Sequence, residues 1–496
     1  MSPAQDSARR VAAVDLGATS GRIMAVEVGP GRLTLEEAHR FPNGAVPVGS
    51  SLLWDVVGIH REILAGLRAV AAGGPLDGIG IDSWAVDYGL LDRDGTLLAT
   101  PYSHRDRRTD GVAEQVLRKI GAAELYAVTG VQQLSFNTVY QLVAASGTAA
   151  LDAARTLLLL PDLFGYWLTG EARAERTNAS TTQLYDVTRR EWSADLARRV
   201  GVPSEILPAL VDPGARIGTL LAGVATDLGV GTGVPVIAVG SHDTASAVVG
   251  VPAEDGDFAY ISSGTWSLVG LELDRPVLTE QARLANFTNE TGVDGTIRFL
   301  RNVMGLWVLS ECTRAWEAEG PVDLAALLAG AAAAPPLRTV VDIDDPALLA
   351  PGTAADPMPA RLGALARRGG EPGPDSRAAV VRCVLDSLAL AYRRALRTAA
   401  GLAGRHPRVV HVVGGGSRNA LLCQLTADAC GLPVLAGPAE AAALGNALVQ
   451  ARTLGADLPD LAAMRSLIRR THDVARYEPR AAGLDWDAAQ RRVTGG

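Results

Sequence analysis

The chain has 496 residues, of which 48% are hydrophobic and 20% are charged, and its formal net charge is -8. One hydrophobic core rarely serves so long a chain, so we expect two domains, and the composition is that of a protein that folds throughout. Net negative charge without a basic run excludes general nucleic-acid binding, because phosphate backbones attract a basic face.

Several features of the sequence bear on the compartment. The apolar stretches 156–168 and 324–337 are broken or ended by proline, glycine or aspartate, so neither is expected to cross a bilayer. The first apolar run comes too early for a signal peptide. The four cysteines form no Cys-x-x-Cys motif, and we expect buried thiols. We therefore expect a cytoplasmic protein that binds neither membrane nor nucleic acid. For its assembly we expect a monomer or homodimer.

The first predicted element is a β-hairpin with apolar strands at 11–14 and 22–28. Its tip runs from Asp15 to Arg22 and combines a carboxylate, glycines, hydroxyls and a cation. Glycine lets backbone N-H groups approach anionic oxygens, while Arg22 can pair with phosphate and Asp15 can hold Mg²⁺ through water. The tip is thus a candidate triphosphate cradle, and the alternative is an ordinary hairpin whose Asp15 caps the turn.

A helix over 58–72, strands over 79–81 and 88–91, and helical material over 110–125 follow in the alternation typical of α/β domains. Between the two strands lies a loop that contains Asp82, Trp84 and Asp87. Carboxylates beside an aromatic ring are suited to binding a polyol. The alternative is a surface loop with a core tryptophan.

The apolar strand 234–239 leads into Gly240–Ala247, a turn followed by a helix of small residues. A carboxylate at this place lies at the C-terminal end of a strand, where open α/β sheets bind ligands. Asp243 is therefore the candidate base, and the alternative is a plain helix N-cap. His242 beside it is either a sugar contact or a satisfied buried histidine.

The second half repeats the first pattern. Strands at 258–261 and 267–273 enclose the tip Ser262–Ser267, which suggests duplicated α/β domains, 1–247 and 248–496, with a cleft between them. Residues 337–374 are predicted to be an irregular loop. A helix over 377–403, a strand over 409–413 and a helix over 419–430 ended by Gly431 follow.

Three glycines, Gly414 to Gly416, lie between the last strand and the last of these helices. No side chain then separates the backbone from a flat ligand, so a nucleotide base or ribose is expected at the positive end of the helix. The alternative is a flexible loop in which Ser417 is the N-cap.

Taken in this order, the motifs resemble the FGGY carbohydrate kinases, which have the actin/Hsp70/hexokinase-like ATPase fold. The resemblance covers residues 11 to about 450 and rests on these segments: Val14–Ala18, Gly21–Arg22, Gly80–Asp82, Val86–Asp87, Phe136–Leu142, Ser241–Val248, Tyr260–Leu268, Asn302–Trp307 and Val413–Cys430.

The resemblance implies an α/β fold of two ribonuclease H-like domains with an interdomain cleft. It implies transfer of the ATP γ-phosphate to the 1-hydroxyl of L-rhamnulose, with Mg²⁺ held by Asp15 and Asp243 as the base. Expected ATP contacts are Ala18, Thr19, Ser20, Gly21, Arg22, Gly264, Thr265, Ser310, Gly415, Gly416 and Asn419. Expected sugar contacts are Ala85, Asp87, His242, Asp243, Thr244 and Asn302.

The chain departs from the family pattern at three positions. Ala85 stands where glycine is usual after the tryptophan, His104 where tyrosine is expected, and Ser310 where glutamine is expected. The first two concern the sugar, so L-fuculose, xylulose and glycerol stay open as alternative acceptors. An ATPase of the chaperone or filament type, without a sugar acceptor, and a silent sugar-sensing regulator are the other function classes.

Overall fold

The computed structural model describes residues 8–480 and 483–494, which form two compact units. Unit 1 comprises 8–254, 272–299 and 440–472, and unit 2 comprises 255–271, 300–439 and the described residues after 472. Each unit therefore gathers segments that are distant in the sequence. The division into domains 1–247 and 248–496 stays a prediction.

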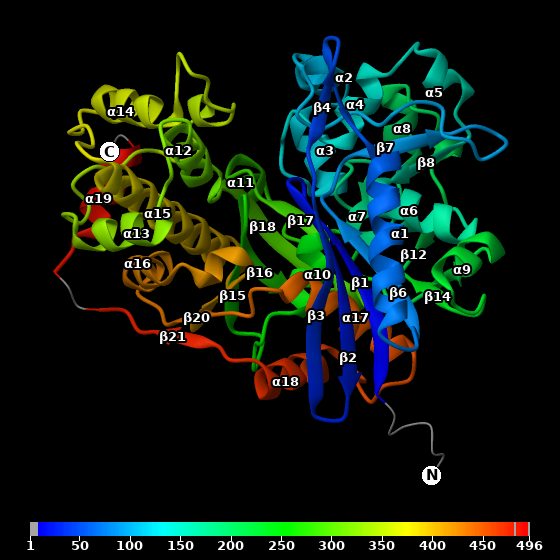
Figure 1. The fold of residues 1–496 in the computed structure, drawn as a ribbon. Helices are drawn as coiled ribbons and strands as arrows, with labels where there is room; N and C mark the ends of the chain where they lie inside the picture. Colours follow the sequence, from blue (N-terminus) through cyan, green and yellow to red (C-terminus); the bar gives the residue numbers. More distant parts are fainter. Residues whose placement is uncertain (1–7, 481–482, 495–496) are drawn as a thin grey trace. The chain divides into compact units, whose positions relative to one another are not determined.

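Unit 1 is built on a sheet whose described strands have the order β13-β14-β6-β1-β2-β3. The bounds of these strands are β1 Arg9–Leu16, β2 Ser20–Gly29, β3 Arg32–Pro42, β6 Gly78–Ser83, β13 Arg216–Thr219 and β14 Pro235–Ile237. The first hairpin is present, because β1 and β2 pair antiparallel, and β1 pairs parallel with β6. Figure 1 shows β2 and β3 as long blue arrows beside each other.

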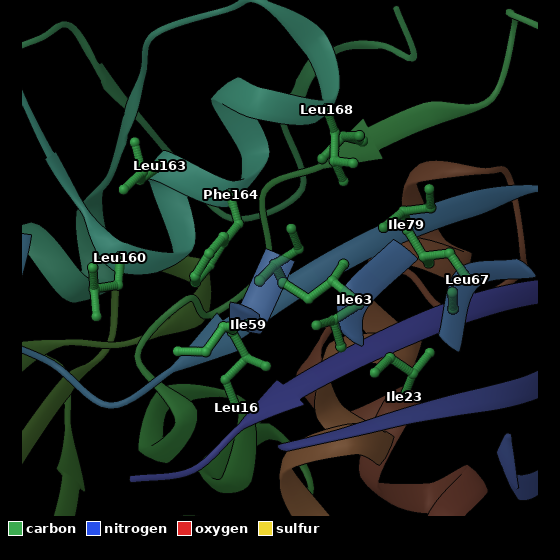
Figure 2. Packing of buried hydrophobic residues seen from close by; sticks show 14 of the residues in the cluster. Leu16, Ile23, Ile59, Ile63, Leu67, Ile79, Leu160, Leu163, Phe164 and Leu168 are labelled. Atoms are coloured by element: carbon green, nitrogen blue, oxygen red, sulfur yellow. The ribbon is translucent and has the colours of Figure 1, made fainter. Parts of the chain in front are cut away.

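Alternate residues of β1 face the two sides of this sheet. Val14 and Leu16 pack with helices α1 (Val56–Ala72) and α6 (Leu160–Thr169), as Figure 2 shows for Leu16, Ile63 and Phe164. Val11 and Ala13 face the other side and pack with α17 (Ala441–Thr453). Successive residues of a strand face opposite sides of its sheet, so a strand whose residues are apolar on both faces is expected to be covered on both sides. The structure has this arrangement at β1.

The remaining elements of unit 1 are short strands and helices. The short strands are β4 Ala45–Val48, β5 Ser51–Trp54, β7 Tyr88–Leu91, β8 Thr156–Leu159, β9 Ala174–Glu175, β10 Tyr185–Asp186, β11 Glu191–Trp192, β12 Leu210–Val211 and β17 Thr288–Thr291. The helices are α2 Val112–Ile120, α3 Ala122–Thr129, α4 Thr138–Ala144, α5 Ala149–Ala153, α7 Arg176–Ala179, α8 Ala194–Val200, α9 Ala222–Leu228, α10 Asp243–Val249, α11 Glu280–Leu284 and α18 Leu461–Thr471.

Unit 2 contains the strands β18-β16-β15-β19-β20-β21 in this order, of which β16 and β18 begin or end in residues of unit 1. Their bounds are β15 Phe258–Ser263, β16 Trp266–Leu273, β18 Ile297–Met304, β19 Val409–Val413, β20 Val434–Ala436 and β21 Ala475–Tyr477. The helices are α12 Trp307–Glu317, α13 Leu324–Ala333, α14 Met358–Arg368, α15 Arg377–Ala403, α16 Ala420–Cys430 and α19 Trp486–Thr494. The predicted second hairpin is β15 with β16, paired antiparallel.

Two segments differ from the prediction. The helical material over 110–125 is two helices, α2 and α3, because Gly121 has a φ of 84° and ends the first. The segment 337–374 is not an irregular loop throughout, because α14 lies within it. Met358 and Leu362 of α14 are buried one helical turn apart, and that apolar spacing is obscured in the sequence by the neighbouring prolines and glycines.

Two expectations about the whole chain can be compared with the described residues. Within 8–480 and 483–494, no helix combines the length and apolarity that a bilayer crossing requires. The four cysteines are free thiols, of which Cys312, Cys383 and Cys423 are buried and Cys430 is partly buried. The prediction of buried thiols therefore holds for three of them.

Candidate active site

The tip of the first hairpin is a tight turn closed by the backbone N-H of Gly17, which donates to the carbonyl of Ser20 at 2.9 Å. Thr19 is exposed at the tip, and Ala18 and Ser20 are partly exposed. Gly21 is required by packing, because a Cβ there would lie 2.2 Å from the Phe41 ring. The glycine at 21 thus has a structural reason in addition to any role toward phosphate.

Arg22 lies beside Asp15 because the two residues are register partners in the hairpin. Its guanidinium forms ion pairs with both Asp15 and Glu440. Glu440 directly precedes α17, so these ion pairs attach the start of that helix to the hairpin. Burial raises the pKa of Asp15, although Arg22 opposes the shift, and the neighbouring Asp243 raises the pKa further.

Asp82 is the register partner of Asp15 on its other side, in the parallel strand β6. Its carboxylate is fully buried, and one oxygen accepts from the Asn446 side chain at 2.6 Å. Its other oxygen has no hydrogen-bond partner among the described residues. Burial raises the pKa of Asp82 well above its ordinary value, and Asp15 and Asp243 add to the shift.

The end of β1 therefore gathers four acidic side chains, Asp15, Asp82, Asp243 and Glu440, around Arg22. Within the described residues, no three of the side chains that commonly bind metals form a ready-made metal site. Mg²⁺ commonly uses one or two carboxylates together with water and substrate phosphates. An excess of carboxylates at a solvent-reached edge fits such a cation.

Asp243 is the first residue of α10, and the N-cap position is occupied by His242, which makes no side-chain capping bond. The plain N-cap alternative for Asp243 is therefore not what the structure has. The Asp243 side chain is one-third exposed and accepts a hydrogen bond from the Thr244 hydroxyl at 3.0 Å. A carboxylate free of capping and open to solvent can receive a proton from a bound hydroxyl.

The turn before Asp243 is held from two sides. The backbone N-H of Ser83 donates to the carbonyl of Ser241 at 2.9 Å, which joins β6 to this turn. The buried carboxylate of Glu175 accepts from the Ser241 N-H at 3.0 Å and from its hydroxyl at 2.8 Å. Burial raises the pKa of Glu175, while bonds from Thr177 and Ser241 oppose the shift. The position of Asp243 is thus fixed by residues that do not touch it.

His242 is held by a buried ion pair. Its Nδ1 lies 3.1 Å from both the Arg298 Nη1 and the Glu290 Oε2, and those two groups are 3.0 Å apart. Its Nε2 lies 3.5 Å from the Asp243 Oδ1. Burial alone would raise the pKa of Glu290, but Arg298 and then His242 outweigh it and leave the pKa lowered. Of the two interpretations of His242, the structure has a histidine with buried partners that also faces Asp243.

The polar loop after β6 is organised by Asp87, whose side chain is fully buried. Its Oδ2 accepts from Trp54 Nε1 at 2.7 Å, from Trp84 Nε1 at 2.9 Å and from His104 Nδ1 at 2.8 Å. Its Oδ1 accepts from the Gln141 amide at 2.9 Å. Burial raises the pKa of Asp87, but His104 and the other donors lower it by more, so the group is ionised at neutral pH.

Val86, between Ala85 and Asp87, has a φ of 70°, which is a strained conformation for a β-branched residue. Its carbonyl accepts from the Thr138 hydroxyl at 2.8 Å and from the Gln141 amide at 3.3 Å. These bonds from α4 hold the strained backbone in place. Ala85 is partly exposed beside it, so the loop presents a rigid surface.

The predicted nucleotide contacts of unit 2 form two connected groups. Gly264 and Thr265 at the second hairpin tip accept hydrogen bonds from the N-H groups of Leu306 and Trp307 at 3.1 Å each. Ser310 is exposed one turn further along α12, and Asn302 is partly exposed in β18. The tip of the hairpin is therefore joined to the start of α12.

The three consecutive glycines have different surroundings. A Cβ at Gly416 would lie 2.0 Å from the Ser263 hydroxyl, whereas a Cβ at Gly415 would meet nothing within 4 Å. Gly415 thus borders open space. Asn419 caps α16 by accepting from the Leu422 N-H at 3.0 Å, so Ser417 is not the N-cap.

These contacts can be compared with the predictions. The structure brings Asp15, Arg22 and Asp243 together in unit 1, and joins Gly416 to the second hairpin in unit 2. Four further residues of the site lie in segments without a recognisable motif and were not predicted: Glu175, Glu290, Arg298 and Glu440. Asp82 was noticed in its loop, but only the register of β1 with β6 places it beside Asp15.

Comparison with protein-family models adds a separate observation. The model of the N-terminal domain of the FGGY family of carbohydrate kinases matches residues 11–250, and that of the C-terminal domain matches residues 259–454. The chain belongs to this family.

Two curated relatives of this FGGY kinase align with nearly its whole length. A rhamnulokinase of Bacteroides thetaiotaomicron is 44% identical over 480 residues, which is 96% of this chain and 97% of that protein. A rhamnulokinase of Pectobacterium carotovorum is 45% identical over 478 residues, 95% of this chain and 94% of that protein.

Solved structures show the fold. A gluconate kinase of Lactobacillus acidophilus superimposes with a TM-score of 0.80 at 16% identity, and covers 98% of this chain and 96% of its own. A glycerol kinase of Plasmodium falciparum, solved with ADP, has a TM-score of 0.77 at 14% identity with the same coverage. The predicted fold class, a two-domain α/β protein of the actin/hexokinase type, is confirmed.

Proposed function

We propose that this FGGY kinase transfers the γ-phosphate of ATP to the 1-hydroxyl of L-rhamnulose, giving L-rhamnulose 1-phosphate and ADP. Relatives named rhamnulokinase that align with nearly the whole chain support the choice of acceptor. The observation that carries the chemistry is the position of Asp243. Its carboxylate is one-third exposed, makes no capping bond and lies beside the Asp15–Arg22 pair.

Phosphoryl transfer has a loose transition state, so the protein mainly aligns the reacting groups and neutralises charge. In our proposal Asp243 accepts the proton of the 1-hydroxyl as its oxygen bonds to phosphorus. Arg22 and the backbone of Ala18, Thr19, Ser20 and Gly21 contact the phosphates. Gly264, Thr265, Ser310, Gly415, Gly416 and Asn419 contact the rest of the nucleotide.

Mg²⁺ is the metal that we propose, and Asp15 is the residue that would hold it, through water. When bound, the ion would offset the charge of the phosphates. The acidic cluster around Arg22 supports this proposal, because a polyphosphate cannot approach several carboxylates without a cation between them.

For the sugar we propose contacts with Ala85, His242, Thr244 and Asn302. Asp87 is fully buried and its oxygens already accept from four donors, so we propose that it acts on the sugar through the side chains that it holds. We propose that the protein works in the cytoplasm and that it is a monomer or a homodimer.

The test is a coupled assay of ADP release with Mg·ATP and L-rhamnulose, L-fuculose, D-xylulose or glycerol, with the product identified by ³¹P NMR. We expect the highest kcat/KM with L-rhamnulose and a 1-phosphate product. A higher value with another acceptor would replace the substrate but keep the kinase. ADP release at the same rate without any acceptor would contradict a kinase and favour an ATPase.

A further inference from the structure

A cavity of about 260 Å³ lies in unit 2 between the end of α13 and the start of α15, which pack beside each other (Figure 1). Its walls come from α13 as far as Ala333, from the loop that begins at Ala334, and from α15 as far as Cys383. None of the described residues that line it belongs to the proposed active site. A cavity of about 150 Å³ can hold a benzene ring, so this one has room for a small organic molecule.

The loop wall of the cavity, residues 334–339, is held by buried bonds. Leu337 has a φ of 54°, in the left-handed region that leucine rarely adopts. Its N-H donates to the Asp386 carboxylate at 2.8 Å, and its carbonyl accepts from Arg492 at 2.6 Å. The wall is therefore formed by the fold itself, before any ligand binds.

Arg382 is the buried cation of this cavity, with a side chain that is 9% exposed. Its Nε donates to both oxygens of Asp386 at 2.9 and 3.0 Å. Its Nη1 donates to the carbonyls of Ala331 and Ala334 at 3.3 Å each. Its Nη2 donates to no residue within 8–480 and 483–494, and it is not sealed from solvent. Since the guanidinium is always charged and buried donors are normally satisfied, the unused Nη2 calls for an acceptor in the cavity.

The charges around the cavity favour an anion as that acceptor. The 27-residue helix α15 has no acidic residue in its first turn, and the N-H groups of Arg377 and Ala378 have no described acceptor. Such a helix start attracts negative charge. Of the described lining residues, Asp375 carries a carboxylate, but Arg338 pairs with it at 2.7 Å. Burial raises the pKa of the Cys383 thiol to about 12, so this group adds no negative charge.

The remaining walls indicate the body of the ligand. They are apolar and come from Gly330, Ala333, Pro335, Ala378 and Ala379. The hydroxyls of a sugar phosphate would lie against these groups without partners, whereas a hydrocarbon body would not.

We infer that this cavity binds a small organic carboxylate. The carboxylate accepts from the Arg382 Nη2 and from the first N-H groups of α15, and the hydrocarbon body packs against the apolar walls. The site is separate from the proposed kinase function and does not depend on it.

Two substitutions test the two halves of the site. Arg382→Lys keeps a cation beside Asp386 but removes the second nitrogen that donates into the cavity. Ala379→Leu fills the cavity, and since Ala379 is only partly buried, the fold should tolerate the larger side chain. Arg397→Lys is the matched control, because Arg397 lies further along α15, is 59% exposed and pairs with Asp487 at 3.2 Å.

The probe is benzoate, with benzyl alcohol as its uncharged counterpart, in calorimetric titration of the full chain with saturating Mg·ADP. We expect wild type and Arg397→Lys to bind one benzoate with a Kd of about 1 mM or tighter, and benzyl alcohol at least about 10-fold more weakly. Arg382→Lys should weaken benzoate binding about 10-fold, and Ala379→Leu should abolish it, with the circular dichroism and kcat of Ala379→Leu unchanged.

Absence of benzoate binding by the wild type, equal affinities for benzoate and benzyl alcohol, or an unchanged affinity in Ala379→Leu would each overturn the inference. Ala379→Leu alone decides if Arg382→Lys does not fold. Tighter binding of inorganic phosphate than of benzoate would overturn the choice of a carboxylate. A wild type that binds benzoate but phosphorylates no ketose would contradict the proposed function and leave this site standing.

Discussion

Asp87→Asn should be one of the most destabilising conservative changes in the chain. If the amide oxygen faces the two indoles and His104, the amide nitrogen faces the Gln141 amide, and one buried donor is left unsatisfied at a cost of about 1–3 kcal/mol. Gln141 cannot turn round freely, since its oxygen accepts from Arg108. The three remaining bonds lose the charge of the acceptor. We expect a total loss of about 3–5 kcal/mol, the cost typical of breaking a buried charged network.

The lowered pKa of Asp87 also determines how the loss of stability in Asp87→Asn depends on pH. The pKa of Asp87 is lower in the folded than in the unfolded chain, so its stabilisation is complete above the unfolded value of about 3.9 and is lost as pH falls through the folded value. Wild type and Asp87→Asn should therefore differ at pH 7 and converge in acid.

Equilibrium unfolding in urea, followed by circular dichroism at pH 7 and at lower pH, measures both effects. Asp195→Asn is the matched control, because this exposed residue pairs with Arg198 on the surface and its replacement should change the free energy of unfolding by at most about 0.5 kcal/mol. A loss below about 1 kcal/mol for Asp87→Asn, or a difference independent of pH, would refute the account of this network.

Two further substitutions test the surroundings of the site. Burial, and then the charge of Glu175, raise the pKa of Asp162, so ionising this carboxyl costs the folded protein stability as pH increases. Thermal unfolding of Asp162→Asn should therefore show a growing stability advantage over wild type as pH rises from about 5 to about 8. A gap that shrinks over this range would contradict that assignment. Gly445→Ala should lose about 3 kcal/mol and much of its turnover, since the new Cβ would lie 1.9 Å from the Ser246 carbonyl of α10. Gly223→Ala, in α9 with nothing within 4 Å, should be neutral or slightly more stable, and equal losses in both variants would argue against close packing as the cause.

The helices and strands whose ends and faces depend on neighbouring residues could be predicted from the sequence. The first hairpin follows from alternating apolar residues around a glycine-containing turn, and the end of α16 follows from Gly431, which has the left-handed conformation. The cap of α16 at Asn419 was not predicted. The helix α14 was missed, because its few buried residues stand among prolines, glycines and arginines.

The site could be predicted only in part, for a similar reason. Asp243 is recognisable from its place between an apolar strand and a helix of small residues. Arg22 and Glu440 are 418 positions apart, and only the folded chain brings them together. The buried pair Glu290–Arg298 likewise has no local signature, although it holds His242. Residues that support a site through tertiary contacts therefore need the structure.

The central claim is that Asp243 removes the proton from the attacking hydroxyl. The most direct measurement is the kcat of Asp243→Asn with L-rhamnulose and Mg·ATP, beside calorimetric affinities for both substrates. Asp294→Asn, which removes a carboxylate paired with Arg452 at 2.8 Å, serves as the control. We predict that kcat falls about 10²- to 10⁴-fold in Asp243→Asn while both affinities stay within about threefold of wild type. A kcat within a few-fold of wild type would contradict the role of Asp243.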